Sequence, residues 1–441
     1  MAAVLRSLLV APIYAASIDT GGGQRTYHLH RALARLGSVD ILLVSEPAFA
    51  DLEATLESLR AQFADARSVR VHRSAPQFVL APASGAGLAR RLGYALRRVL
   101  GALRPRSALY RPSREAVEAL QGLIDAEDHH LVVGRYLRCT ALSGAFEQQR
   151  APVVVDLDDL DEIVLRSRIR APTTGRLKRL VLARQARQTE QVVHRLRQRC
   201  RHLFIASDAD RGFVEHPSTS VLPNIPLPAA ASFTQVAPET DDPVVLFVGS
   251  RAHRVNHEGL LRFVSACWPL ISARMPTARL RVVGSGGWEA LREALEKTPG
   301  VTVVGRVDEV ADEYAQAALC VVPLFEGSGT KIKVLEALAH GRPVVVAGHS
   351  ARGYERLIGH GVVVAHDETA MADECLKLLG DPVRRRALGT SGQRLVEESH
   401  GFEALFARFT QALAAAGIEV VDVVRPSPVL PKEVGAASGA D

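Results

Sequence analysis

One stretch of the sequence combines residue types that suit phosphate binding, and it runs from residue 321 to 344 as VVPLFEGSGTKIKVLEALAHGRPV. An apolar strand pattern leads into a glycine loop, and a helical pattern follows. Backbone N–H groups in such a loop can approach an anion closely, and the helix N-terminus adds partial positive charge. Six residues could contact the phosphate or a ribose hydroxyl: Gly327, Ser328, Gly329, Lys331, Lys333 and Glu336. The stretch predicts a phosphate-binding loop, and the alternative is a capped helix with solvated lysines.

The order of residues disfavours two other phosphate motifs. A Walker A loop ends in Gly-Lys-Ser/Thr, whereas Thr330 precedes Lys331 in this chain. A dinucleotide-binding fingerprint needs a third glycine after Gly284 and Gly286, and Glu289 stands in that place. The sequence therefore argues against a nucleoside triphosphatase, a kinase or a dinucleotide-dependent enzyme.

Short apolar runs that alternate with helical segments must position this loop. Because the runs are apolar on both faces, they are typical of parallel strands covered by helices. Strands are expected at Val4–Val10, Val39–Val44, Leu131–Val133, Val153–Val155, Leu203–Ala206, Val244–Val248, Leu280–Val283, Val301–Val304, Leu319–Val322, Pro343–Val346 and Val362–Val364. Ligands of such sheets bind beyond the carboxyl ends of the strands. The pattern predicts two tandem Rossmann-like, doubly wound α/β domains that face an interdomain cleft.

Changes in composition set the expected domain boundaries. A stretch rich in Pro, Ala and polar residues, 225–242, is predicted to link the domains. Three segments result: an N-terminal domain over 1–228, a C-terminal domain over 229–424, and a mobile tail over 425–441. Helices are expected at Gln24–Leu36, after a glycine turn at 21–23, at Glu258–Arg274, and as one long solvated helix within 166–201.

The composition excludes several classes of protein. The 441 residues carry a net charge of +6, and the five cysteines form no CxxC pair, which argues against a disulfide scaffold or a zinc cage. No apolar run is long enough to span a bilayer. The apolar opening is predicted to be the first buried strand, with a signal peptide as the alternative. We therefore expect a cytoplasmic location.

From residue 245 to about 409, the sequence resembles the retaining glycosyltransferases of family four, which have the GT-B fold. The resemblance rests on Phe247-Val-Gly-Ser, on Asn256 with Gly259, on the glycine loop, and on Glu336-Ala-Leu-Ala-His-Gly-Arg-Pro. It is looser in the first half, where three motifs match in place and kind: Gly21-Gly22-Gly23, Asp156-Leu-Asp-Asp and Leu222-Pro-Asn. The resemblance implies transfer of a hexose from a UDP- or GDP-sugar with retention of configuration.

Two departures from the family pattern affect the expected site. Ser328 stands where many members carry the first of two glutamates, and Glu326 could supply the displaced carboxylate. Lys331 matches the basic residue that follows the threonine in members lacking that glutamate. The usual Gly-Arg and Lys that hold the diphosphate are replaced by Gly249-Ser250, with Arg251 and Arg254 as substitutes.

The resemblance and the chemistry of the reaction assign the candidate site residues. Negative charge develops on the leaving diphosphate, and fixed N–H donors with a lysine could stabilise it without a metal or a cofactor. The expected catalytic residues are Asp158, Asp159, Glu326 and Lys331. The expected donor-binding residues are Gly22, Gly23, Ser250, Arg251, Arg254, Arg306, Val307, Ser328, Gly329, Thr330, Lys331, Lys333 and Glu336. Arg306 resembles the family position whose neighbouring backbone meets the nucleotide base.

The acidic cluster that includes Asp158 and Asp159 follows a predicted strand, where one carboxylate could accept the acceptor's hydroxyl proton. Solvated helix-capping carboxylates and a metal-binding Asp-x-Asp motif are the alternatives. Two further classes of function share the fold: a non-catalytic nucleotide-sugar-binding or scaffold protein, and a nucleotide-sugar epimerase.

The expected partners are the nucleotide-sugar donor and a glycan or lipid-linked acceptor. Residues 88–104 form a basic amphipathic pattern that suits either an anionic membrane surface, with a peripheral location on its inner face, or packing on the domain. Nucleic-acid binding is not expected, because aromatics make up 5% of the chain and no binding module is present.

Overall fold

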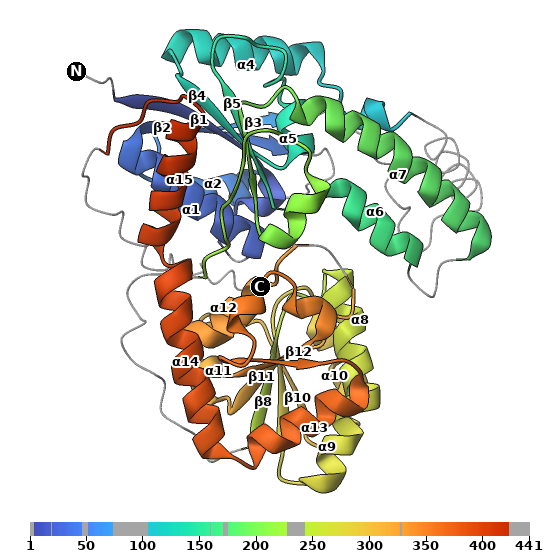
Figure 1. Cartoon of the computed structure of the whole chain (residues 1–441). Helices are drawn as coiled ribbons and strands as arrows, with labels where there is room; N and C mark the ends of the chain where they lie inside the picture. The colour runs from blue at the N-terminus through green and yellow to red at the C-terminus, as the bar shows by residue number, and fades with distance from the viewer. Residues whose placement is uncertain are drawn as a thin grey trace, which may run out of the picture. The chain divides into compact units, whose positions relative to one another are not determined.

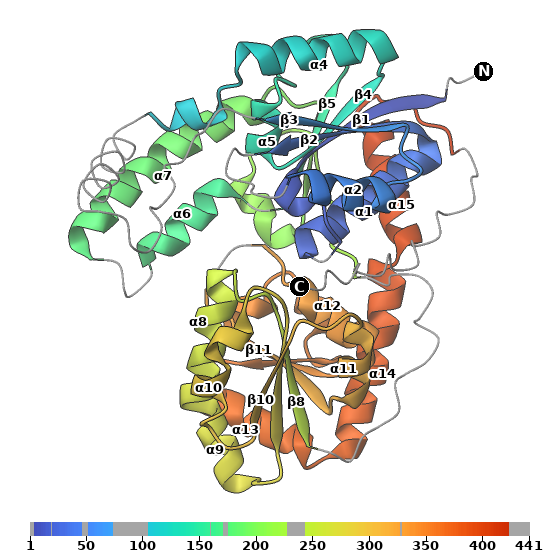
Figure 2. The ribbon, with the colours of Figure 1, turned by 180° about the vertical axis from the view of Figure 1, so that it is seen from behind.

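A computed structural model describes residues 4–18, 20–45, 52–73, 105–158, 160–170, 175–226, 243–326 and 329–422. The chain divides into two compact units, each with its own parallel sheet (Figure 1, Figure 2). Unit 1 holds Met1–Ile205, Phe213–Val221 and Arg408–Asp441, and unit 2 holds Ala206–Gly212 and Leu222–Ala407. The predicted α/β architecture with two parallel sheets is confirmed. Residues 227–242 of the linker expected at 225–242, and the whole expected tail, lie outside the described residues.

The sheet of unit 1 has seven parallel strands in the order β3-β2-β1-β4-β5-β6-β7. The strands are β1 (Leu5–Pro12), β2 (Gly37–Ser45), β3 (Ser68–Arg73), β4 (Leu131–Arg135), β5 (Val153–Leu157), β6 (His202–Ile205) and β7 (Thr219–Val221). The sequence missed the edge strands β3 and β7. β3 is only half-buried and β7 has three residues, so neither produces a continuous apolar run.

Helices flank this sheet: α1 (Gly21–Leu36), α2 (Leu52–Gln62), α4 (Arg114–Glu127), α5 (Leu137–Leu142), α6 (Asp161–Arg170) and α7 (Arg176–Arg197). The prediction of a glycine turn at 21–23 was wrong, because these residues form the first turn of α1. Thr20 caps that turn by accepting a hydrogen bond from the Gly23 N–H at 3.0 Å. The long helix expected within 166–201 is found as α7, but Arg166–Arg170 belong to α6, which lies beside α7 in both views of the chain (Figure 1, Figure 2). Leu165, Leu182 and Ala186 form the buried contact between them.

The sheet of unit 2 has six parallel strands in the order β10-β9-β8-β11-β12-β13. They are β8 (Val244–Val248), β9 (Arg279–Val283), β10 (Val301–Gly305), β11 (Leu319–Val322), β12 (Val344–Ala347) and β13 (Val362–Ala365). All six match the expected apolar runs. The strand order reverses between β8 and β11, which is where open α/β sheets bind ligands.

Helices cover both faces of this second sheet: α8 (Arg254–Arg262), α9 (Trp268–Arg274), α10 (Arg292–Leu295), α11 (Val310–Gln316), α12 (Ile332–Ala339), α13 (Glu368–Leu379) and α14 (Pro382–His400). Along β8, Val245 and Phe247 pack into one core and Leu246 into the other, as the alternation of a strand requires. The continuous helix expected at Glu258–Arg274 is interrupted by a π turn at Phe263–Cys267. Pro269 follows this turn and lacks the N–H that a regular helix would use.

The last helix, α15 (Phe402–Ala415), begins in unit 2 and ends in unit 1. In unit 1 the Phe409 ring stacks on Phe204 of β6, with ring centroids 5.3 Å apart. The C-terminal part of the chain therefore contributes to the core of the N-terminal unit.

The start of β2 yields a test of packing. A Cβ atom at Gly37 would fall on the carbonyl oxygen of Leu5, its partner in the β1–β2 register. We expect Gly37→Ala to lower the free energy of unfolding by about 1–3 kcal/mol, because backbone must move to admit the methyl group.

Gly122→Ala is the matched control. Gly122 lies inside α4 and a Cβ there meets open space, so alanine should raise the free energy of unfolding by up to about 1 kcal/mol. Urea denaturation measures both variants. A Gly37→Ala variant as stable as the unaltered protein would contradict the close contact between Gly37 of β2 and Leu5 of β1.

Candidate functional site

Three loops at the carboxyl ends of β8, β9 and β10 stack backbone against backbone in unit 2. The Gly249 N–H donates to Val283 O at 2.9 Å, and the Gly284 N–H donates to Gly305 O at 2.7 Å. A Cβ at Gly284, whose φ is +141°, would collide with the carbonyl oxygen of Gly249. The Arg251 N–H donates to Ser285 O at 2.9 Å and joins the same stack. The glycines therefore form a surface of bare backbone where a ligand of this sheet would lie.

Lys333, on the first turn of α12, reaches under the first of these loops. Its Nζ donates to Asn256 Oδ1 at 2.8 Å and lies 5.1 Å from the centre of the Phe247 ring. Asn256 Nδ2 in turn donates to Ser250 O at 2.9 Å. A Cβ at Gly249 would lie 2.5 Å from the same Nζ. Burial lowers the pKa of Lys333 to about 7, with Glu336 opposing the shift.

The contacts of Lys333 show how a basic group reaches the loop after β8. The basic residues expected from the resemblance are absent after β8, yet Lys333 of α12 brings an amino group to Gly249 and, through Asn256, to Ser250. The sequence placed Lys333 among the donor-binding residues but gave no sign of its contact with Asn256. Its role toward a donor stays a prediction.

The predicted phosphate loop is described in part, because Gly327 and Ser328 lie outside the described residues. Gly329 adopts a left-handed φ of +63°, and the Nζ of buried Lys331 donates to its carbonyl at 2.7 Å. Thr330 Oγ1 accepts from Asn224 Nδ2 at 2.7 Å. Lys331 therefore stabilises the bend of the loop directly before α12.

The two arginines proposed as phosphate ligands differ in their surroundings. The guanidinium of Arg254 forms ion pairs with both Glu258 and Glu326, so two carboxylates already compensate its charge. The Nε of Arg251 is buried, and no described residue accepts a hydrogen bond from it. A Cβ at Gly287 would lie 3.6 Å from Arg251 Nη1, which places this side chain beside the second glycine loop. Arg251 is thus the better candidate for an anion.

Glu336 lies on α12 beside a tyrosine that sequence analysis did not single out. The Tyr314 hydroxyl donates to Glu336 Oε2 at 3.4 Å, and its ring stacks on His340 with centroids 4.7 Å apart. Burial and the neighbouring Glu336 raise the pKa of Tyr314. Glu336 is half-buried, whereas Arg306 is exposed directly after β10 and Val307 packs partly against the core. Contact of any of these with a donor stays a prediction.

In unit 1, the acidic cluster is centred on a buried ion-pair network. Asp156, at the end of β5, has no exposed surface and accepts hydrogen bonds from Arg25 at 2.8 and 2.5 Å and from Arg135. Arg135 Nε also donates to Thr26 Oγ1 at 3.1 Å. Burial by itself would lower the pKa of Arg25 and Arg135, but the neighbouring carboxylates outweigh it and raise the pKa of both arginines. The sequence did not indicate either arginine, because each is distant from Asp156 along the chain.

The remaining acidic residues of the cluster do not share one site. Asp158 Oδ2 accepts from Arg135 and Tyr136, each at 3.2 Å, while Asp159 lies outside the described residues. Asp161 accepts from the Tyr110 hydroxyl at 2.5 Å, and Glu162 pairs with Arg197 at 2.7 Å. Within the described ranges, no group of three or more His, Cys, Asp or Glu side chains could hold a metal ion.

Gly22 and Gly23, which the sequence analysis placed among the donor-binding residues, also have packing roles. A Cβ at Gly23 would collide with the carbonyl oxygen of Ser17, and one at Gly22 would lie 2.9 Å from the Tyr136 hydroxyl. The Gly22 carbonyl accepts from Arg135 Nη2 at 3.0 Å. The glycines thus let the start of α1 approach the buried network, and their contact with a donor stays a prediction.

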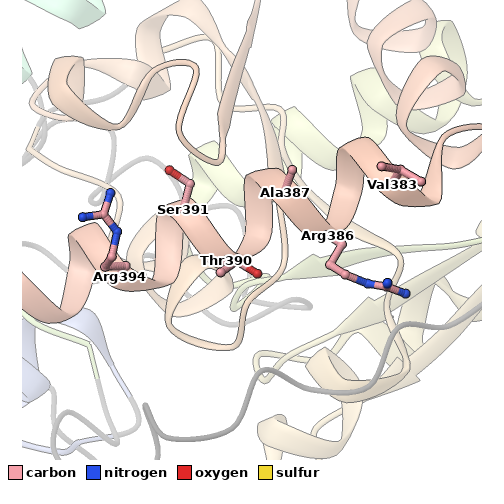
Figure 3. Close-up of a pocket in the computed structure, with 6 residues that line it drawn as sticks. All are labelled: Val383, Arg386, Ala387, Thr390, Ser391 and Arg394. Carbon is pink, nitrogen blue, oxygen red and sulfur yellow. The ribbon is translucent and has the colours of Figure 1, made fainter.

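A shallow depression on α14 is a poor candidate for a site. The side chains that line it, shown in Figure 3, all come from this one helix and include no carboxylate: Val383, Arg386, Ala387, Thr390, Ser391 and Arg394. No second element contributes a group that could orient a ligand.

The expected peripheral membrane location concerns two parts of the chain: the surface of α7, and the segment predicted to contact a membrane. The exposed surface of α7 carries several cations without a described ion pair and the apolar Leu180, which is 68% exposed. These cations are Arg176, Lys178, Arg179, Arg184 and Arg187. Residues 88–104 lie outside the described residues. Among the helices that the structure describes, none has both the length and the apolar character needed to cross a membrane.

Both sheets with their flanking helices have the architecture of GT-B glycosyltransferases. The chain aligns with sucrose-phosphate synthase from Thermosynechococcus elongatus at a TM-score of 0.63 and 19% identity, over 93% of this chain and 98% of that one. It aligns with Anabaena Alr3699/HepE in complex with UDP at a TM-score of 0.59 and 15% identity, over 93% and 100% of the two chains. These likenesses establish the GT-B fold.

Residues 242–381, which fall within the range of unit 2, match the family described as "Glycosyl transferases group 1". Over 186 residues the chain is 32% identical to a GDP-mannose-dependent monoacylated alpha-(1-6)-phosphatidylinositol monomannoside mannosyltransferase from Corynebacterium glutamicum. That alignment covers 40% of this chain and 48% of the relative. The chain thus spans about half the length of this curated relative.

The buried network of unit 1 gives a stability test. Asp156→Asn removes a carboxylate from between two buried arginines and leaves their charges uncompensated. We expect the free energy of unfolding to fall by about 3–5 kcal/mol. Asp125→Asn, which breaks an exposed pair with Arg150, should change it little. Urea denaturation compares the two, and equal effects would show that Asp156 is not a structural ion-pair partner.

Lys333 gives a pH test. Its pKa is about 7 in the folded chain, against an ordinary value of 10.5. Between these values the unfolded chain binds a proton that the folded chain lacks, so this group makes stability rise with pH from about 7 to about 10.5. Below pH 7 its full destabilising effect is present.

Lys333→Met should remove this contribution and flatten the dependence of stability on pH in that window. Lys377→Met is the control, because Lys377 is exposed and pairs with Glu374. Thermal unfolding in buffers from pH 6 to 10 measures the difference. An unchanged slope in Lys333→Met would contradict the burial of its amino group.

Proposed function

We propose that this chain is a glycosyltransferase that moves a hexose from a UDP- or GDP-sugar to a glycan or lipid-linked acceptor. The observation that carries the proposal is the stack of bare glycine backbone beyond β8, β9 and β10, with the amino group of Lys333 beneath it. Loops without side chains let a diphosphate approach closely, and a desolvated amino group suits its negative charge. The match of residues 242–381 to group 1 glycosyl transferases supports the same assignment.

The proposed reaction breaks the bond between the anomeric carbon and the diphosphate oxygen and forms a bond from that carbon to an acceptor hydroxyl. The leaving diphosphate takes the electron pair, so the main task is to stabilise its negative charge. In our proposal, Lys331 and the N–H groups of Gly329 and Thr330 do so without a metal or cofactor. Attack on the face that the diphosphate leaves would retain configuration, and Asp158 would accept a hydroxyl proton.

The nature of the donor and acceptor is part of the proposal. The name of the Corynebacterium relative includes GDP-mannose and a phosphatidylinositol mannoside, and a solved structure of HepE holds UDP-glucose. A lipid-linked acceptor would bring this protein to the cytoplasmic face of an anionic membrane as a peripheral protein. The cations and the exposed Leu180 on α7 support that location. Binding to nucleic acid is not part of the proposed function.

Binding and hydrolysis of UDP-, GDP-, ADP- and dTDP-sugars by the full chain test the function. We expect one nucleotide class to bind and to be hydrolysed slowly in EDTA. Lys331→Ala and Glu336→Ala should each weaken donor binding by about 10- to 100-fold, the loss of one charged hydrogen bond. Lys377→Ala removes an exposed lysine and is the control.

The outcomes separate the candidate functions. Binding without hydrolysis or transfer would select the non-catalytic alternative. The ion pair between Glu326 and Arg254 favours that alternative, because Arg254 already pairs with the carboxylate that was expected to replace the glutamate missing at Ser328. A product sugar that forms with no acceptor would select an epimerase. If no nucleotide sugar binds the unaltered chain, the proposed function is wrong.

A further inference from the structure

An exposed tyrosine follows the first strand of unit 1. Tyr14 is 58% exposed on a short 3-10 turn (Ile13–Ala15), while Ile13 and Ala15 on either side are each 2% exposed. Buried neighbours thus fix a turn that presents one aromatic ring to solvent at the carboxyl end of β1. Ligands of parallel sheets bind at this edge.

A second tyrosine at the same edge has an unusual backbone conformation. Tyr136 directly follows β4, and its φ of 61° with ψ of 131° is one that residues with side chains rarely adopt. Such a conformation costs free energy and persists where the surrounding structure enforces it, often at binding sites. The Tyr136 ring lies 6.3 Å from the Tyr14 ring, and the Arg135 guanidinium covers it at 4.6 Å.

A carboxylate completes this group at the end of β5, the neighbour of β4 in the sheet. Asp158 Oδ2 accepts from the Tyr136 hydroxyl and from Arg135, each at 3.2 Å, and the Asp158 side chain is 13% exposed. A Cβ at Gly22 would lie 2.9 Å from the Tyr136 hydroxyl, so a larger residue there would displace the ring. Three neighbouring strands therefore place two aromatic rings and a hydrogen-bond acceptor together.

The charges of this region favour a neutral ligand. Among the residues that the structure describes in this network, two arginines, Arg25 and Arg135, pair with two aspartates, Asp156 and Asp158. Both guanidinium groups are almost fully buried, so neither presents a cation to solvent. Of these charged groups, Asp158 is the one with exposed surface, so a phosphate or carboxylate would be repelled, whereas a sugar hydroxyl can donate to that carboxylate. The apolar C–H face of a pyranose ring can cover a tyrosine ring.

We propose that Tyr14, Tyr136 and Asp158 form a subsite for a neutral pyranose ring of the acceptor. The ring packs on Tyr14 and Tyr136, and one of its hydroxyls donates to Asp158. This inference rests on the proposed function for the identity of its ligand.

Binding of simple glycosides to the full chain tests the subsite directly. Saturation-transfer NMR titrations use methyl α-D-mannopyranoside, methyl α-D-glucopyranoside and methyl α-D-galactopyranoside, each with and without UDP or GDP. We expect at least one glycoside to bind saturably. Tyr14→Ala should weaken that binding about tenfold or more, and Tyr14→Phe should retain it, because the ring makes the contact.

Two controls test whether binding is specific to this subsite and to a neutral sugar. Phe213→Ala removes another exposed aromatic of unit 1 and should leave glycoside affinity unchanged. Glucose 1-phosphate should bind no more tightly than the methyl glucoside, since the subsite offers no exposed cation. The inference is overturned if no glycoside binds, if Tyr14→Ala binds as tightly as the unaltered chain, or if only the phosphorylated sugar binds.

Donor binding on the same samples distinguishes the two proposals. Glycoside binding that depends on Tyr14, in a protein that binds no nucleotide sugar, would refute the proposed function and keep the subsite. Donor hydrolysis without any glycoside binding would do the reverse. A transfer assay then checks the link, because Tyr14→Ala should raise KM for the acceptor far more than it lowers kcat.

Discussion

The carboxylate of Asp156 lies between the guanidinium groups of Arg25 and Arg135, and none of the three side chains is accessible to water beyond about 1%. Buried charges of this kind are tolerated only when each is paired and hydrogen-bonded. The pairing connects α1, β4 and β5, and it directs Arg135 toward Gly22 and Asp158. The edge of the sheet where a ligand would bind is consequently held by charges that the ligand cannot reach.

In unit 2 the proposed ligand is an anion, and the structure places a lysine amino group beneath loops that carry few side chains. Glycines at the ends of β8, β9 and β10 remove the side chains that would keep an anion away. Lys333 supports this surface from below through Asn256, and the cost of burying its amino group is seen in its lowered pKa. An anion bound above it would restore the charged form, so binding and protonation of Lys333 would favour each other.

The two units thus offer different chemistry on similar sheets. The edge of unit 1 combines aromatic rings with paired charges, for which we propose a neutral sugar, whereas the edge of unit 2 combines glycine loops with a lysine, for which we propose a diphosphate. The proposed glycosyl transfer needs one ligand of each kind. In unit 1 the partly exposed Asp158, which we propose contacts a ligand, is distinct from the buried Asp156, which pairs with both arginines.

Much of the fold and part of the site followed from sequence alone. Buried parallel strands leave continuous apolar runs, so all six strands of unit 2 and the five inner strands of unit 1 were predicted, while the half-buried β3 and the short β7 were missed. The glycine loop before Lys331 was also evident, because its residues are adjacent in the chain. Only the tertiary structure decided the partners: Asp156 with Arg25, Tyr136 with Tyr14, and Lys333 with Asn256. These pairs are separated by tens of residues or more, and the order of strands in each sheet, which local sequence does not encode, brings them together.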